Sequence, residues 1–350
     1  MMIHEPPTPE NIARSAAHYV HSVAANMQAT IYPMTLESYR ASVFLDGRIV
    51  LPDPEASATI NFMELCGLFP NVASAHTRYL FHISHVGSTL VSRQLGCKQN
   101  LLSLREPVLL RWLSQYKALL GRPESRIDVP TYHAFLAVTL GLIGRPLGGI
   151  DQVVVKPTSF TCNLAHDILT AQPKARAIGV YARLDAFVAT ILKGGAGWND
   201  IVELCSIRLK RLHDLLGAEP WQLSQMSPGE IAAMSWLAEM AALQQGAKAA
   251  GERFAWLDFD AYLRAPEPSF AMICDMLRVE WGVADAAAVA ASGLGQRYSK
   301  DSSIAFGMQT RQSLIAEVMA QRSSEISRAR FWLDSAIAAH SEFEALAALS

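Results

Sequence analysis

The chain has 350 residues, of which 51% are hydrophobic, and its 30 Lys and Arg residues nearly balance 32 Asp and Glu residues for a net charge of −2. This length allows one large domain or two ordinary ones with a sizeable core. Without a run of five basic residues, the charge argues against a nucleic-acid partner. The longest apolar runs, such as AFLAVTLGLIG from Ala134, are shorter than the roughly 18 residues that a membrane-spanning helix needs.

The first residues and the cysteines indicate the compartment. The sequence opens MMIHEPPTPE, which has neither the basic start nor the apolar core of a signal peptide, so we expect a cytoplasmic protein. The five cysteines are far apart, odd in number and without C-x-x-C spacing, which argues against a disulfide framework and a zinc site.

The N-terminal 75 residues are expected to form an appendage that packs on the core. Apolar residues at helical spacing predict a helix from Pro9 to Gln28, which would contain His18 and His21. The segment SVFLDGRIVLP predicts a hairpin that turns at Asp46-Gly47. A short helix is expected around Asn61 to Leu68.

The central strand–loop–helix unit lies between Tyr79 and Leu95. Apolar residues alternate from Tyr79 to Ile83 and recur at helical spacing from Leu90 to Leu95, so the period changes from two to 3.6 across Gly87. The first amides of a helix lack internal partners, and a glycine lets an anion approach the backbone. The loop is therefore a candidate phosphate site, although a strand–helix turn with a Ser88 cap explains the same residues.

Strands and helices then alternate along the chain. This order predicts an α/β fold with a mainly parallel central sheet flanked by helices, with the strand ends along one edge. We expect a core domain at 76–305 with a helical insertion, and C-terminal helices at 306–350. The strands are expected at 101–104, 151–156, 175–182 and 253–258, and the helices at 108–120, 132–143, 163–171, 200–216, 228–250, 266–279 and 308–340.

Polar residues follow three of these strands, at the edge where α/β proteins bind ligands. They are Glu106, Lys156 and Arg183. Two simpler interpretations compete for the first two: Arg105 and Glu106 as a local ion pair, and Lys156 as an exposed surface residue. The Asp258-x-Asp260 pair is interpreted as a cap of the next helix.

Taken in order, several segments resemble the P-loop sulfotransferase family, whose members transfer a sulfuryl group from 3′-phosphoadenosine 5′-phosphosulfate (PAPS) to a hydroxyl or amine. The resemblance spans roughly Tyr79 to Lys300. HVGSTL resembles the family's 5′-phosphosulfate loop, and VYARLDAFVATILKGG the segment that holds the 3′-phosphate. Four other segments are also similar to segments of the family: LSLREPVLLRWL, VVVKPTSF, WLDFDAYLRAPEPSFAMICDML and the basic loop QRYSK.

The resemblance implies a P-loop NTPase-like sulfotransferase fold and a set of site residues. His85, Glu106 and Lys156 would be catalytic, with Glu106 as the general base. The residues that would bind PAPS are Val86, Gly87, Ser88, Thr89, Arg183, Thr190, Arg297 and Lys300.

The sequence departs from the family at two of these positions. His85 stands where the family usually has Lys or Arg, and Lys156 could supply that charge instead. Thr190 falls seven residues after Arg183, whereas the family has Ser eight residues after its Arg.

These features predict a PAPS-dependent sulfotransferase that acts on a small-molecule or lipid-like acceptor. No metal is expected, and the terminal helices offer a surface for a homo-oligomer. Because of His85, a nucleotide-binding or interaction module without transferase activity is the alternative. A kinase-like phosphotransferase is disfavoured, since the Gly-Lys-[Ser/Thr] signature is missing.

Overall fold

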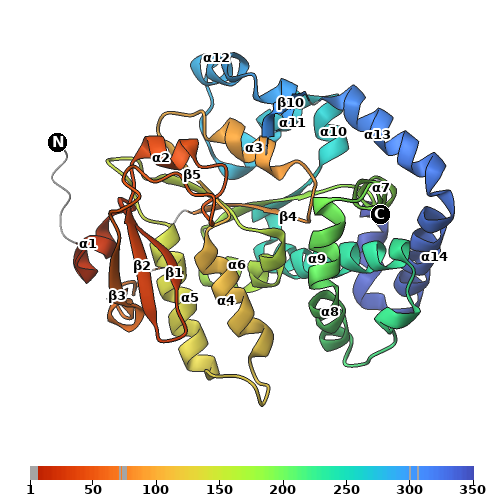
Figure 1. Cartoon of the computed structure of the whole chain (residues 1–350), viewed down its shortest axis with the longest axis horizontal. Helices are drawn as coiled ribbons and strands as arrows, with labels where there is room; N and C mark the ends of the chain where they lie inside the picture. The colour runs from red at the N-terminus through yellow and green to blue at the C-terminus, as the bar shows by residue number, and fades with distance from the viewer. Residues whose placement is uncertain (1–6, 71, 73–76, 299–300, 306) are drawn as a thin grey trace.

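A five-stranded parallel sheet forms the centre of the molecule (Figure 1). The structure, a computed structural model, describes residues 7–350 apart from 71, 73–76, 299–300 and 306. The strand order is β5-β6-β4-β7-β8, and all four pairings are parallel. The strands are β4 (Arg78–His82), β5 (Leu101–Arg105), β6 (Gln152–Lys156), β7 (Arg176–Tyr181) and β8 (Phe254–Asp258). The predicted parallel sheet is confirmed.

Helices cover both faces of this sheet. In Figure 1, α3 and α11 lie on one face, and α4, α5, α6 and α9 on the other. The helices are α1 (Pro9–Arg14), α2 (Leu36–Ala41), α3 (Ser88–Leu95), α4 (Val108–Leu119), α5 (Val129–Ile143), α6 (Ala165–Ala171), α7 (Leu184–Leu192), α8 (Ala196–Leu216), α9 (Pro228–Ala250), α10 (Phe259–Arg264), α11 (Pro266–Leu277), α12 (Val283–Ser292), α13 (Met308–Gln321) and α14 (Ser323–Ala339).

The strand order places a ligand crevice at the end of β4. From β4 the chain runs first to β5 and β6 on one side and then to β7 and β8 on the other. In open parallel sheets, the crevice lies outside the carboxyl ends of the strands at this point of reversal. Since all five strands are parallel, this same edge holds Glu106 and Arg183, which follow β5 and β7, and Lys156, which ends β6.

A separate antiparallel sheet replaces the helix predicted from Pro9 to Gln28. The helix α1 ends where Ser15 becomes extended, and His18 and His21 lie on a strand. The aromatic and β-branched residues of this stretch also suit a pleated, half-buried surface, and packing against α4 selects the strand. The sheet has the order β1-β2-β3, with β1 (His18–Val23), β2 (Gln28–Pro33) and β3 (Ala58–Asn61).

The hairpin predicted at Asp46-Gly47 is also wrong, because no strand forms between residues 42 and 52. The buried Arg105 side chain donates hydrogen bonds to the carbonyls of Tyr39 (2.6 Å) and Ser42 (2.5 Å). These carbonyls therefore need no partner strand. Burial and the nearby Arg93 guanidinium lower the pKa of Arg105 to about 10, so it stays charged at neutral pH.

The remaining predicted elements differ at their ends. The short helix expected at Asn61 to Leu68 is a 3₁₀ helix, Phe62–Leu65. The two C-terminal helices, α13 and α14, are confirmed. The backbone of Arg297 belongs to β9 (Arg297–Tyr298), which pairs with β10 (Asp301–Ala305), whereas Lys300 lies outside the described residues.

Replacing Arg105 with methionine should lower the free energy of unfolding by about 3 kcal/mol, because buried carbonyls would lose charged donors. The control is Arg328→Met, since Arg328 is 61% exposed and pairs only with Glu325 of its own helix among the described residues. That change should cost less than about 1 kcal/mol. Equal losses in a urea titration would show that Arg105 does not support the 42–52 segment.

Candidate functional site

The loop between β4 and α3 directs backbone amides into a cavity. His85 (φ 59°) and Gly87 (φ 69°) are both left-handed, which curls the loop tightly. Gly87 is the N-cap of α3, and no side chain caps this helix. The first amides of α3, from Ser88 and Thr89, therefore have no acceptor within the helix. Such a helix start is suited to binding an anion.

Close packing requires glycine at position 87 for a second reason. A Cβ at Gly87 would lie 1.9 Å from the ring of Phe259, the first residue of α10. The ring thus lies directly against the loop backbone. Both the backbone conformation and this contact exclude a larger residue.

A second helix begins at the same cavity. The N-cap of α8 is Gly195, at φ 67°, and this helix also lacks a side-chain cap. A Cβ on Gly197 would lie 3.7 Å from the ring of His85, so the two helix starts adjoin. Both border a cavity of about 660 Å³. Two positive helix ends therefore act on one space.

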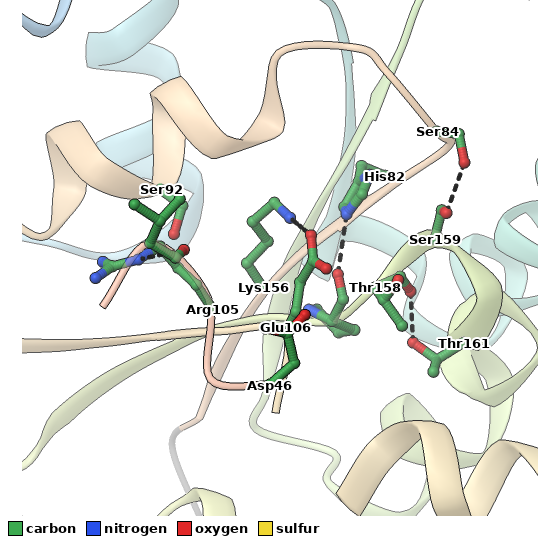
Figure 2. A network of polar contacts seen from close by, with 12 residues as sticks. Asp46, His82, Ser84, Ser92, Arg105, Glu106, Lys156, Thr158, Ser159 and Thr161 are labelled. Atoms are coloured by element: carbon green, nitrogen blue, oxygen red, sulfur yellow. Dashed lines mark hydrogen bonds and ion pairs between the residues drawn. The ribbon is translucent and has the colours of Figure 1, made fainter. Parts of the chain in front are cut away.

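A buried ion pair lies on the floor of this cavity (Figure 2). Lys156 is 1% exposed, and its Nζ lies 2.5 Å from Oε1 of Glu106. Register pairs Arg105 with Lys156 in the sheet, which brings Glu106 to the same level. Glu106 has a left-handed φ of 57°, and its amide donates to the Lys156 carbonyl. The interpretations of an Arg105–Glu106 pair and of an exposed Lys156 are both wrong.

His85 lies between the two helix starts and a carboxylate. Its Nε2 is 3.9 Å from Oδ2 of Asp200, and its side chain is 16% exposed. Asp200 also accepts a hydrogen bond of 2.7 Å from Ser84. The carboxylate favours the imidazolium form, whereas the positive helix ends oppose it.

His82 also lines the cavity, which the sequence pattern did not indicate. Both ring nitrogens lie 2.9 Å from a carbonyl oxygen, Nδ1 from that of Ile83 and Nε2 from that of Pro157. Which of the two nitrogens carries the proton depends on the tautomer of the ring. The two contacts hold the ring in place beneath the loop.

Arg311 of α13 is the main residue of the candidate site that the sequence did not predict. It lines the cavity, is 5% exposed and holds Asp260 in a two-pronged ion pair, with Nε–Oδ1 2.6 Å and Nη2–Oδ2 3.1 Å. Its Nη1 also lies 3.4 Å from the hydroxyl of Thr190. No motif surrounds this arginine in the sequence.

Thr190 lines the cavity, as His85, Val86, Gly87, Ser88, Thr89, Glu106 and Lys156 do. Its hydroxyl donates to the carbonyl of Ala186.

Arg183 does not line this cavity. It borders a neighbouring one of about 500 Å³, is 59% exposed and lies 3.8 Å from Asp258. The side chain of Arg297 and the whole of Lys300 lie outside the described residues.

Two further features of the site, the start of α8 and the cap of α10, can be related to the sequence. The run Lys193-Gly194-Gly195-Ala196-Gly197 is rich in glycine before a helix, a pattern that could have indicated the second helix start. Asp258 accepts from the amide of Asp260, so its interpretation as a helix cap is confirmed.

Comparison with known proteins finds resemblance in solved structures alone. No family model and no curated protein matches the sequence. The chain is similar to bacterial sulfotransferases. The sulfotransferase domain from the curacin biosynthetic pathway is 15% identical, with 71% of this chain and 98% of that chain covered and a TM-score of 0.37.

Two other structures match at a similar level. Sulfotransferase STF1 from Mycobacterium tuberculosis H37Rv is 13% identical, covering 70% of this chain and 78% of that chain, with a TM-score of 0.40. The sulfotransferase domain from the Synechococcus PCC 7002 olefin synthase is 14% identical, covering 72% and 97%, with a TM-score of 0.39. At these values the likeness decides nothing about chemistry, which depends on the residues of the cavity.

The described residues contain neither a membrane-spanning helix nor a metal-binding cluster. Within that part of the chain, no helix combines the length and apolar content that crossing a membrane requires. Nor do three or more His, Cys, Asp or Glu side chains in the described ranges gather as a metal site would need.

Substituting Gly87 with alanine should lower the free energy of unfolding by about 2–4 kcal/mol, because the new Cβ meets Phe259 and the left-handed backbone is strained. Gly47→Ala is the matched control, since its Cβ would enter open space. We expect no loss of stability there. Thermal unfolding of both variants measures the difference, and an equally stable Gly87→Ala protein would contradict the packing described.

Proposed function

We propose that the chain is a sulfotransferase that moves a sulfuryl group from PAPS to a hydroxyl or amine of a small-molecule or lipid-like acceptor. One observation carries this proposal. The amides of Ser88 and Thr89, the start of α8 and the buried Lys156 all converge on one cavity of about 660 Å³. This volume lies in the range of small-molecule sites. The HVGSTL segment, which resembles the family's phosphosulfate loop, forms the wall of that cavity.

The residues fit the donor's phosphosulfate end. The Ser88 and Thr89 amides, with their hydroxyls, would hold the 5′-phosphate at the start of α3. PAPS supplies an activated sulfuryl group joined to that phosphate through a bridging oxygen. Sulfuryl transfer, like phosphoryl transfer, depends on in-line positioning and on positive charge near the leaving oxygen.

Lys156 would supply the fixed charge at the bridging oxygen. Its ammonium group is held in place by burial at the end of β6 and by its pairing with Glu106. A buried, preorganised cation stabilises a developing negative charge more strongly than a mobile surface cation does. His85, at the family's usual Lys or Arg position, would act as a second donor when protonated.

Glu106 would accept the proton of the acceptor group. Its carboxylate is 17% exposed and lies at the cavity, within reach of a bound hydroxyl or amine. While Lys156 remains paired with it, one Glu106 oxygen is occupied by the ammonium group. An anion that draws the Lys156 ammonium toward itself would release this oxygen to accept the proton.

The 3′-phosphate would be bound by Arg311. This guanidinium lines the same cavity as the loop, whereas Arg183, assigned by the resemblance, borders the neighbouring cavity. The Arg311–Asp260 ion pair stands between the two, since Arg311 lines the candidate cavity and Asp260 lines the neighbouring one. The role of Arg183 in nucleotide binding stays a prediction, and the nucleotide experiment below separates the two arginines.

A binding module without transferase activity is the second candidate. The observation in its favour is the closed Lys156–Glu106 pair, together with histidine in place of lysine or arginine at position 85. In that case, nucleotide would bind to the loop while neither member of the pair acts on a substrate.

Adenosine 3′,5′-bisphosphate should raise the melting temperature more than adenosine 5′-monophosphate does, since the 3′-phosphate adds a charge-assisted contact. Arg311→Gln should abolish this excess, and Arg183→Gln should preserve it, each judged against its own melting temperature without nucleotide. If Arg183→Gln abolishes the excess instead, the placement at Arg311 is wrong. Equal effects of both nucleotides on the wild type would count against PAPS itself.

Transfer rates should fall about 10²–10³-fold in Lys156→Met, as when one transition-state donor is removed. Glu106→Gln should also lower turnover, and both variants should still bind adenosine 3′,5′-bisphosphate, which shows that the fold is intact. His85→Lys should raise turnover at neutral pH if a fixed charge is lacking there. Nucleotide binding without transfer to any of a wide panel of hydroxyl and amine acceptors would favour the binding module.

A further inference from the structure

A basic pocket lies at the opposite edge of the central sheet from the candidate site. It has a volume of about 330 Å³ and is lined by Arg78, Lys174, Arg176, Arg253 and Arg278, together with Leu277. These side chains come from the starts of β4 and β7, from the turns before β7 and β8, and from the end of α11. None of the lining residues in the described part of the chain is acidic.

Three of these arginines donate to backbone carbonyls beside the pocket. Arg78 donates to Leu277 (2.6 Å), and Arg176 to Met276 (3.1 Å), both at the end of α11. Arg253 donates to the carbonyl of Ala175 (2.7 Å). These bonds hold the guanidinium groups in fixed orientations, but the carbonyls carry only partial charge and do not neutralise them.

The other two basic residues have no such structural role. No hydrogen bond or ion pair joins the side chains of Lys174 and Arg278 to any residue that the structure describes. Both residues are exposed. Arg278 has a left-handed φ of 49° at the position that ends α11, where glycine is usual. A capping role alone would favour glycine, so the arginine side chain is unexplained by the fold.

The positive charges around the pocket act on one another. Burial lowers the pKa of Arg253, and the neighbouring Arg176 charge lowers it further. Asp151 raises the pKa of Arg78 through space but does not line the pocket. A bound anion stabilises like charges that line one pocket.

We propose that this basic pocket binds a small oxyanion with at least two negative charges, carried either as free diphosphate or as the phosphate ester of a small molecule. Guanidinium groups held in fixed positions attract phosphate oxygens, and the exposed Lys174 and Arg278 add two further positive charges. The pocket's volume suits a small ligand better than a macromolecular surface. The proposal does not depend on the proposed function, because the two sites lie at opposite edges of the sheet.

The test measures hydrogen–deuterium exchange with and without inorganic pyrophosphate. In the wild type, pyrophosphate should slow exchange at residues 174–178 and 274–279. The variant Lys174→Gln/Arg278→Gly should lose that protection, with about tenfold weaker binding in calorimetry. Arg278→Gly suits the left-handed backbone, so it removes charge without straining the fold. Lys210→Gln, at an exposed site in α8, is the matched control and should bind as the wild type does.

Protection that persists unchanged in the double variant would overturn the proposal, as would protection confined to residues 85–90 of the candidate site. The latter result would leave the proposed function standing, and loss of nucleotide binding at the candidate site would leave this pocket standing. A parallel titration with glycerol 3-phosphate identifies the source. Tighter binding of the ester than of pyrophosphate indicates a phosphorylated small molecule, and the reverse indicates free diphosphate.

Discussion

The buried ion pair between Lys156 and Glu106 is the interaction on which the candidate site depends. A lysine that is 1% exposed is stable in its charged form only beside an opposite charge, and Glu106 lies 2.5 Å away to supply it. The pair joins the ends of β5 and β6, and Glu106 adopts a strained left-handed backbone to reach it. Backbone strain of this kind persists where the surrounding structure enforces it, and it is common at functional sites.

Positive potential above that pair comes mainly from backbone. The helices α3 and α8 both start at glycine caps without side-chain partners, so their amides face the cavity unsatisfied by their own helices. Lys156 and Arg311 add cationic groups around them, each held by a carboxylate, Glu106 and Asp260. Backbone amides and two fixed cations therefore lie around one small space, an arrangement that suits a phosphorylated ligand.

Local signals allowed much of the core to be predicted from the sequence. The change of period across Gly87 located the loop, and the apolar run before Lys156 located a strand end, because both depend on neighbouring residues. The strand β1 was mistaken for part of a helix, since its residues suit either form until they pack against α4. Arg311 could not be predicted, because its ion pair with Asp260 forms only when α13 packs against α7 and α10.

A crystal structure of the complex with adenosine 3′,5′-bisphosphate tests the central claim most directly. We predict 5′-phosphate oxygens within hydrogen-bond distance of the Ser88 and Thr89 amides, with the Lys156 ammonium turned from Glu106 toward the phosphate. A nucleotide found outside this cavity, or bound there with its phosphates away from the start of α3, would contradict the account.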